Sequence, residues 1–263
     1  MKICTLSSGS KGNCTYVESG GAAVLIDQGL SLRELERRAL EVGLDLKKVR
    51  LIAVTHEHTD HIKGVQAFCD KYGVQAFISP LSAANAYEKY AVTSCVPTSV
   101  SGFDTGISVG EMYLTPFRVH HDAAYTVGYQ IEDGKKTLCL ATDLGYVTAG
   151  AGKRMSKADA VLLESNHDVY MLEHGKYPRY LKQRIAGNNG HLSNDSAADV
   201  GVKLVQAGVK RLILGHLSQD NNTPQAAYNT VCAAMTAAHI RQGKDVVVEV
   251  AHQFQPSMLT EII

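Results

Sequence analysis

HEHTDH, residues 56–61, places three histidines and an aspartate directly after the apolar run VRLIAVT at 49–55. The run predicts a buried strand, and residues two apart at the end of a strand point the same way, so His56 and His58 can bind one metal ion. If the chain then turns into a helix, Asp60 and His61 reach toward a second ion. The alternative interpretation of this segment is a solvated polar loop.

Further candidate ligands stand where other apolar segments end. His120 and His121 follow the predicted strand at 112–119. Asp143 follows the run at 136–142, and His216 follows RLILG at 211–215. Polar side chains at the strand ends of an α/β scaffold collect in one site, so these residues complete the set that HEHTDH begins. Imidazole and carboxylate ligands suit zinc, manganese or iron without choosing among them.

The rest of the chain alternates strand and helix patterns. We expect strands at 2–8, 14–19, 22–28, 49–55, 74–79, 112–119, 126–132, 136–142, 158–165, 211–215 and 245–250. We expect helices after Ser31, which has the capping-box partner Glu34, around 65–73, after Pro80, and near 194–207 and 224–240. Two β-rich halves, each followed by βα units, predict two sheets with helices on their outer faces.

Charge balance, cysteine spacing and the length of apolar runs limit the possible classes of protein. Lys plus Arg (26) equals Asp plus Glu (26), so contact with nucleic acid needs a local basic patch. The six cysteines are scattered without a CxxC pair, which favours reduced structural thiols. The beginning of the chain lacks the apolar core of a signal peptide, and there is no apolar run of about 18 residues. We therefore expect a cytoplasmic protein with no membrane partner.

The order HxHxDH, His, Asp, His resembles the metallo-β-lactamase superfamily over nearly the whole chain. The resemblance implies an α/β fold of the αββα sandwich type, in which two mixed sheets are flanked by helices. It also implies two divalent metal ions per chain at one edge, zinc or manganese, with iron as the alternative.

The resemblance further implies a role for each candidate ligand. One ion is expected on His56, His58 and His121, and the other on Asp60, His61 and His216, with Asp143 bridging the two. Asp27, after the strand run AVLI, matches an aspartate that braces the metal loop. His121 is preferred to His120 because related nucleases place this ligand seven residues before a glycine, and Gly128 fits.

Such a centre lowers the pKa of water and holds a phosphoryl or carbonyl group, but it leaves the substrate open. Glu164, at the end of ADAVLLES, and His191, in GHLSNDS, narrow the choice. They resemble a Glu–His pair of ribonuclease Z that assists phosphodiester cleavage. We expect His191 to act as a general acid oriented by Glu164, with Asp60 as a third catalytic group. The alternative for His191 is a surface histidine beside a helix cap.

Candidate substrate contacts lie in two segments. HGKYPRYLKQRIAG at 174–187 interleaves tyrosines with Lys176, Arg179, Lys182 and Arg184, which suits a nucleic-acid backbone and stacked bases. A plain solvated helix is the alternative. The loop SSGSKGN at 7–13, with Lys11, Asn13 and free amides, is a second candidate phosphate contact.

The spacing between the motifs is short. Only 59 residues separate His61 from His121, and 72 separate Asp143 from His216, which leaves no room for the inserted β-CASP domain of ribonuclease J or the extended arm of ribonuclease Z. We therefore expect residues 1–263 to form a single domain. The motifs resemble the compact YycJ (WalJ) group, which implies a nuclease that acts on DNA rather than RNA, from 5′ to 3′. The alternatives are a small-molecule (cyclic) phosphodiesterase, a thioester or lactone hydrolase, and a non-catalytic nucleic-acid-binding module.

Overall fold

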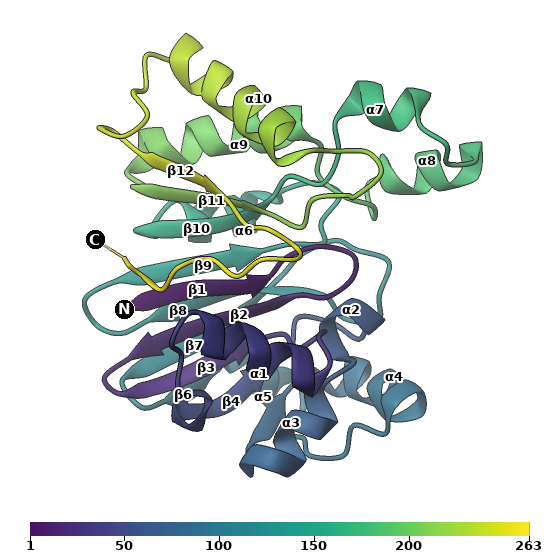
Figure 1. The fold of residues 1–263 in the computed structure, drawn as a ribbon, viewed down its shortest axis with the longest axis vertical. Helices are drawn as coiled ribbons and strands as arrows, with labels where there is room; N and C mark the ends of the chain where they lie inside the picture. The colour runs from purple at the N-terminus through teal and green to yellow at the C-terminus, as the bar shows by residue number, and fades with distance from the viewer. Residues whose placement is uncertain (263) are drawn as a thin grey trace.

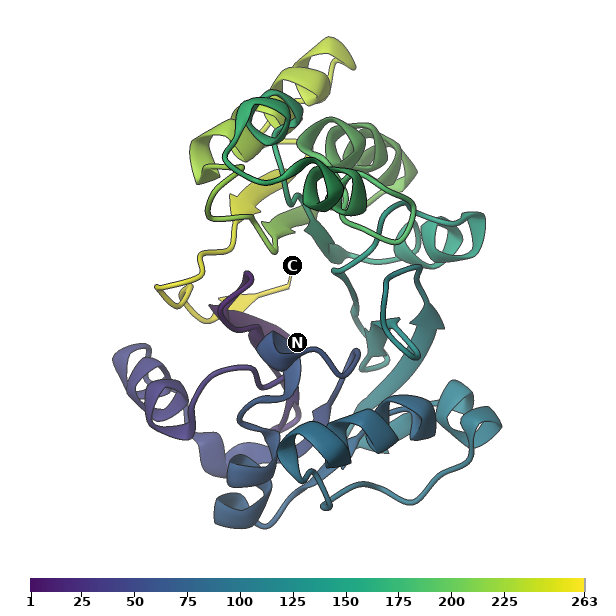
Figure 2. The same ribbon diagram turned by 90° about the vertical axis from the view of Figure 1, so that its right-hand side faces the viewer.

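The computed structural model describes residues 1–262 and contains two mixed β-sheets packed face to face, with helices on both outer sides (Figures 1 and 2). The predicted αββα sandwich is therefore confirmed. All six cysteines have free thiols. No helix within residues 1–262 is both long enough and apolar enough to cross a membrane.

The first sheet is built mainly from the N-terminal half. In spatial order its strands are β13 (Thr260–Glu261), β1 (Lys2–Ser7), β2 (Cys14–Ser19), β3 (Ala22–Ile26), β4 (Val49–Ala53) and β5 (Gln75–Phe77). β1, β2 and β3 are antiparallel neighbours, whereas β3, β4 and β5 are parallel.

The second sheet is antiparallel at one end and parallel at the other. In spatial order its strands are β12 (Val247–Val250), β11 (Arg211–Gly215), β10 (Ala160–Glu164), β9 (Thr137–Ala141), β8 (Val127–Glu132), β7 (Met112–Arg118) and β6 (Ile107–Val109). The parallel members are β9 to β12, and the predicted turn at Asp133 and Gly134 joins the antiparallel pair β8 and β9.

Helices lie outside the two sheets, on their outer faces and at one edge. Those of the N-terminal half are α1 (Leu32–Glu41), the 3₁₀ helix η1 (Leu46–Lys48), α2 (Thr59–Ile62), α3 (Val65–Tyr72), α4 (Pro80–Tyr90) and α5 (Val100–Thr105). Those of the C-terminal half are α6 (Ala149–Met155), α7 (Val169–His174), α8 (Arg179–Ile185), α9 (Asn194–Ala207) and α10 (Pro224–Ala237). Figure 1 shows α9 and α10 on one outer side of the sandwich and α1 and α3 on the other.

Strand alternation sorts the apolar side chains into layers. In β9, Leu138 and Leu140 join the core between the sheets, whereas Cys139 and Ala141 face the outer helices. The outer cores pack α1 and α3 on the first sheet and α6, α9 and α10 on the second. Burying one large apolar side chain contributes about 1.5–3 kcal/mol, so the helices are held mainly by these layers.

The topology brings several strand ends to one edge. β3 and β4 are parallel in the first sheet, and β9, β10 and β11 are parallel in the second. The chain that follows β4 forms α2, and the chain that follows β10 forms α7, and both helices lie on the right-hand side in Figure 1. The predicted site residues follow these strands and therefore meet at this edge.

Most predicted elements are present, with ends shifted by a few residues. The sequence patterns do not predict η1, α5, β6, α6, α7 or β13, which are all short. The segment 174–187 is not one helix: α7 ends at His174, and α8 begins at Arg179 after a break.

Candidate metal centre

The HEHTDH segment changes from extended chain to helix within its own length. His56 follows β4 and is fully buried, and His58 is the N-cap residue of α2. Asp60 and His61 lie inside α2. The change of backbone direction turns the two pairs toward different sides of one cluster, as the sequence predicts.

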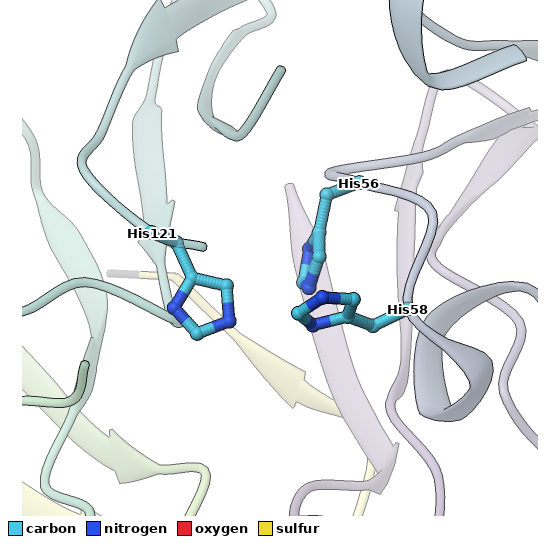
Figure 3. Close-up of side chains that lie close together, drawn as sticks. All are labelled: His56, His58 and His121. Atoms are coloured by element: carbon cyan, nitrogen blue, oxygen red, sulfur yellow. The ribbon is translucent and has the colours of Figure 1, made fainter. Parts of the chain in front are cut away.

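Three imidazoles form the first group of candidate ligands. The ring centroids of His56 and His58 are 4.6 Å apart, and those of both rings lie 5.2 and 5.0 Å from that of His121. Figure 3 shows the three side chains directed toward a common point from two segments of the chain. Each offers a nitrogen within 4.8 Å of the others, which is a spacing that one ion can bridge.

His121, and not His120, belongs to this group. Nδ1 of His121 lies 3.1 Å from the carbonyl oxygen of Gly190, which leaves Nε2 for the cluster. The His120 side chain is exposed and stacks on Tyr146 with ring centroids 5.0 Å apart. The backbone turn after β7 therefore sends the two neighbouring imidazoles in different directions.

A second group lies beside the first. The carboxylate of Asp60 is 3.4 Å from Nε2 of His61 and 3.5 Å from Nε2 of His216. Asp143 lies between the groups: its Oδ2 is 3.2 Å from His61, and its Oδ1 is 3.4 Å from His216 and 3.7 Å from His121. The structure thus brings together all seven predicted ligand side chains.

Unpaired buried atoms test whether a metal fits here. Nε2 of His56, Nε2 of His216 and Oδ2 of Asp143 are buried, and within residues 1–262 none of them makes a hydrogen bond of good geometry. A buried polar atom without a partner costs about 1–3 kcal/mol, so three of them in one cluster need a compensating ligand. Imidazole nitrogens and carboxylate oxygens are the donors that divalent zinc, manganese and iron accept. The cluster is suited to divalent metal ions.

Asp27 and Thr55 support this cluster from behind. Oδ2 of Asp27 lies 2.7 Å from Nδ1 of His61 and accepts a hydrogen bond from the Thr55 hydroxyl at 2.9 Å. Thr55 also donates its backbone N–H to Asp27 at 2.7 Å. An imidazole whose Nδ1 is held by a carboxylate presents Nε2 to a metal, so the contacts agree with the bracing role expected for Asp27.

Strained backbone occurs at three residues of this edge. Asp27, Asp143 and His216 have φ values of 60°, 57° and 55°, in the left-handed region that residues with a side chain seldom adopt. Each one directly follows a strand or lies one residue beyond it. Such strain costs of order 1–3 kcal/mol and persists where the surroundings enforce it, as in a binding site.

One carboxylate orients two histidines. Oε1 of Glu164 lies 2.9 Å from Nδ1 of His191 and 2.8 Å from Nδ1 of His216. Its other oxygen, Oε2, accepts the backbone N–H groups of Leu144 and Leu192, both at 3.0 Å. The predicted pair of Glu164 and His191 is therefore in contact, and Glu164 also holds a candidate metal ligand.

The charges of this group follow from its contacts. Burial alone would raise the pKa of Glu164, but the charge of His191 and hydrogen bonds from His191 and His216 lower that pKa to about 2. Burial also opposes protonation of His191, yet the attraction and hydrogen bond of Glu164 outweigh burial and raise the pKa of His191. For Asp60, burial is likewise outweighed by His61 and His216, which lower its pKa.

Several neighbours were not identified from the sequence. Oδ1 of Asp122 lies 3.2 Å from Nε2 of His121. The Ser8 hydroxyl accepts the backbone N–H of His216 at 2.8 Å, and Asn166 donates to the His216 carbonyl, also at 2.8 Å. His167 is buried and lines a cavity of about 210 Å³ together with His191, and its Nδ1 has no hydrogen-bond partner in the described part of the chain, residues 1–262. Only Asp122, directly after His121, carries a signal that the sequence could have provided.

The predicted basic contacts lie at different distances from this cluster. Arg184 pairs with Asp122, which itself lies beside His121. Lys182 donates to the carbonyl oxygen of Glu173 at 2.8 Å, which ties α8 to α7. Lys176 and Arg179 are exposed, the latter in α8, which buries no residue. Arg184 is therefore the basic side chain of this segment that the structure connects to the cluster.

Lys11 and Asn13 occupy the loop between β1 and β2. Lys11 is exposed, whereas Asn13 is buried and its amide nitrogen lies 3.1 Å from Oδ2 of Asp60 and 3.0 Å from Nε2 of His61. Asn13 thus belongs to the hydrogen-bond network of the cluster. A role for either residue in substrate binding stays a prediction.

Comparison with known proteins agrees with this fold. Residues 22–217 match the family described as the beta-lactamase superfamily domain, and the chain therefore belongs to that superfamily. In structure it is similar to the metallo-beta-lactamase fold protein YhfI from Bacillus subtilis, with a TM-score of 0.70 and 16% identity over 97% of this chain and 98% of that one.

Sequence similarity indicates which family within the superfamily the chain belongs to. The chain is 33% identical to exodeoxyribonuclease WalJ of Streptococcus pneumoniae serotype 2 (strain D39 / NCTC 7466) over 100% of its own length and 98% of the relative. It is 34% identical to exodeoxyribonuclease YycJ of Bacillus anthracis with the same coverage. Within the superfamily, the chain belongs to the WalJ and YycJ family.

Proposed function

We propose that the protein is a metal-dependent phosphodiesterase that degrades DNA as a 5′ to 3′ exonuclease. The observation that carries the proposal is the position of His191, whose ring centroid lies 5.0 Å from that of His121 and 5.3 Å from that of His216. A proton donor beside a divalent-metal cluster suits a phosphodiester, since its alkoxide leaving group needs protonation far more than a thiolate does. The names of the two full-length relatives support DNA as the substrate.

The cluster would hold two divalent ions, zinc or manganese, with iron as the alternative. His56, His58 and His121 form one set, Asp60, His61 and His216 the other, and Asp143 lies between them. When bound, such ions lower the pKa of water and neutralise charge on a phosphoryl group. The chain itself orients the ligands, through Asp27 for His61 and through Glu164 for His216.

His191 supplies the proton for the leaving oxygen. As the oxygen of water bonds to phosphorus and that water releases one proton to the solvent, the P–O bond to the leaving group breaks and its electron pair stays on the leaving oxygen. This oxygen takes a proton from His191, and the solvent returns a proton to the imidazole. Glu164 holds Nδ1 of His191 and leaves Nε2 as the nitrogen that reaches the substrate. The products are one fragment with the phosphate and one with a free hydroxyl.

The approach of the strand would involve basic side chains around this edge. Arg184 stands beside Asp122, and Lys11 lies on the loop whose Ser8 contacts the His216 backbone. Lys176, Arg179 and Lys182 extend the same basic segment outward from Arg184. Together they offer positive charge to the phosphate backbone of a nucleic acid.

Two further proposals accompany this function. We propose that residues 1–263 form one domain without an inserted β-CASP domain, which the shared core between the two sheets supports. A cytoplasmic location also stays a proposal, and a DNA substrate agrees with it.

One experiment separates the candidate activities. Metal-loaded protein is incubated with end-labelled single- and double-stranded DNA, with RNA, and with a small chromogenic phosphodiester. We expect shortening of DNA from the 5′ end, and we expect Asp143→Ala to lose at least about 10²-fold in rate, because it removes a candidate ligand of the metal ions that would stabilise charge on the phosphoryl group. The control variant is Leu40→Ala, an exposed position on α1. Cleavage of the small ester alone, or full activity in Asp143→Ala, would overturn the proposal.

A further inference from the structure

A cavity of about 390 Å³ lies beside the candidate metal centre, at the same edge of the sandwich. Its walls come from the segment after β11, the start of α10, and the segment after β12. Leu217, next to His216 in the chain, forms part of one wall, and Ser8, whose hydroxyl accepts the His216 N–H, forms part of another. Its volume falls within the roughly 300–1,000 Å³ typical of small-ligand sites.

The chemistry of the walls favours a neutral polar group over a phosphate. Among residues 1–262, the cavity is lined by no lysine, arginine, aspartate or glutamate. Its polar side chains are amides and hydroxyls, including Gln219, Ser218 and Gln255, together with the imidazole of His252. Amides pair with the donor and acceptor edges of nucleobases, whereas a phosphate needs positive charge. The ligand part that fits is therefore planar, neutral and polar at its edge.

Phe254 supplies a face on which such a group can stack. Its side chain is 63% exposed and lines this cavity. The backbone beside it is held firmly: the Gln253 carbonyl accepts hydrogen bonds from the buried Arg38 at 2.6 Å and from Ser7 at 2.8 Å. A large aromatic ring on an anchored segment stays in place for a ligand without the entropy cost of ordering a loop.

Gln253 adds an unsatisfied donor to the same wall. It is 91% buried, and its Oε1 accepts the backbone N–H of Lys11 at 3.3 Å. Its Nε2 has no hydrogen-bond partner within residues 1–262. A buried amide donor without a partner is costly, which marks this wall as the surface for a polar ligand.

We propose that this cavity binds one unpaired nucleobase of the DNA strand, stacked on Phe254. The inference rests on the proposed nuclease function and adds to it a contact with a base in place of a phosphate. Because the cavity adjoins the backbone of His216, the bound base belongs to a nucleotide within a few positions of the cleaved bond. Neutral amide walls and a stacking face predict tolerance of all four bases.

Kinetics of two matched variants test the proposal. Phe254→Leu keeps an apolar side chain but removes the aromatic face, and Met258→Leu is the control, an exposed apolar residue of the same segment that does not line this cavity. On a single-stranded oligonucleotide we expect Phe254→Leu to lower kcat/KM about tenfold, mainly through KM. On a small chromogenic phosphodiester, Met258→Leu should match the wild type, and Phe254→Leu should lose much less than it loses on the oligonucleotide.

An abasic scan locates the base. A set of oligonucleotides, each lacking one base at a different position, is cleaved by the wild type and by Phe254→Leu, and the rates of the two proteins are compared on each oligonucleotide. At one position the two proteins should cleave equally, because the base that Phe254 stacks on is missing. Phe254→Trp should retain activity, and since the chain has no other tryptophan, oligonucleotide binding should quench its fluorescence.

The outcomes are distinct. If the wild type cleaves no DNA, the nuclease function itself is overturned, and this inference falls with it. If the wild type cleaves DNA but Phe254→Leu equals Met258→Leu, or if the loss is the same at every abasic position, the base site is overturned and the nuclease function stands. The base site is also contradicted if the oligonucleotide does not change the fluorescence of Phe254→Trp.

Discussion

The tetrapeptide GHLS occurs twice, at 190–193 and at 215–218, and the two copies meet at one carboxylate. His191 of the first copy and His216 of the second both point Nδ1 at Oε1 of Glu164, at 2.9 and 2.8 Å. The residues are the same and so is their partner. The two imidazoles nevertheless face different surroundings.

The difference lies in the backbone that carries each copy. His216 directly follows β11 with φ of 55°, is buried, and places Nε2 3.4 Å from Asp143. His191 precedes α9, and 19% of its side chain is exposed. His216, buried at a strand end inside the cluster, is a candidate metal ligand. His191, partly exposed at the rim of the cluster, is a candidate proton donor. Local sequence alone does not determine these roles.

The largest expected loss of activity comes from replacing His216. His216→Ala removes a candidate ligand, so we expect loss of one metal ion per chain and a fall of about 10³-fold in kcat/KM for DNA, the scale of removing a charge-stabilising group. Metal content of the purified variant, measured by mass spectrometry, and initial rates check this. Leu40→Ala serves as the control. Full metal content in His216→Ala would remove His216 from the ligand set.

Local patterns predict the parts of this site that follow single strands. HEHTDH after an apolar run predicts four candidate ligands, and the ends of later apolar runs predict Asp143 and His216 as candidates in the same way. The contact of Glu164 with His216 was not foreseen, because it joins the ends of two neighbouring parallel strands that lie 52 positions apart. Asp122 follows His121 directly, but its partner Arg184 comes from α8, 62 positions away.

Local sequence patterns also predict only part of the fold. Long periodic segments such as α9 and α10 were predicted because many apolar residues repeat in them. α7 is only six residues long and begins at the cap Asp168, whose side chain accepts the N–H of Met171. Helices this short are marginal on their own, and packing decides whether they form. Leu172 is the buried residue that anchors α7, and a single apolar position has no period to detect.

An intermediate effect is expected on the His191 side. His191→Ala should keep the wild-type metal content and lose about 10²-fold in rate on DNA, the lower end of a general acid's contribution, because the leaving oxygen then departs without a positioned proton donor. The loss should shrink on a nitrophenyl phosphodiester, whose leaving group is stable as an anion. Rates on both substrates and metal analysis test this. Equal losses on the two substrates would rule out the proton-donor role and leave a structural one.

The smallest effect separates support of the metal cluster from support of a helix. Ser8 is buried and accepts the His216 N–H, whereas Ser193 caps α9 by accepting the Ser196 N–H at 3.2 Å. Ser8→Ala leaves a buried N–H unpaired at a cost of about 1–3 kcal/mol, and Ser193→Ala loses a cap worth about 1 kcal/mol. Denaturant unfolding should therefore show both variants destabilised.

Metal titration distinguishes the two serine variants. We expect Ser8→Ala to weaken metal affinity by about tenfold or less, because the backbone of His216 loses its hydrogen bond and can move the imidazole, a candidate ligand, out of position. We expect Ser193→Ala to bind metal like the wild type. The His191 loop would then stabilise the fold through its serine, and the His216 loop would depend on a serine from the other sheet. Weakened metal binding in Ser193→Ala alone would reverse this assignment of the two loops.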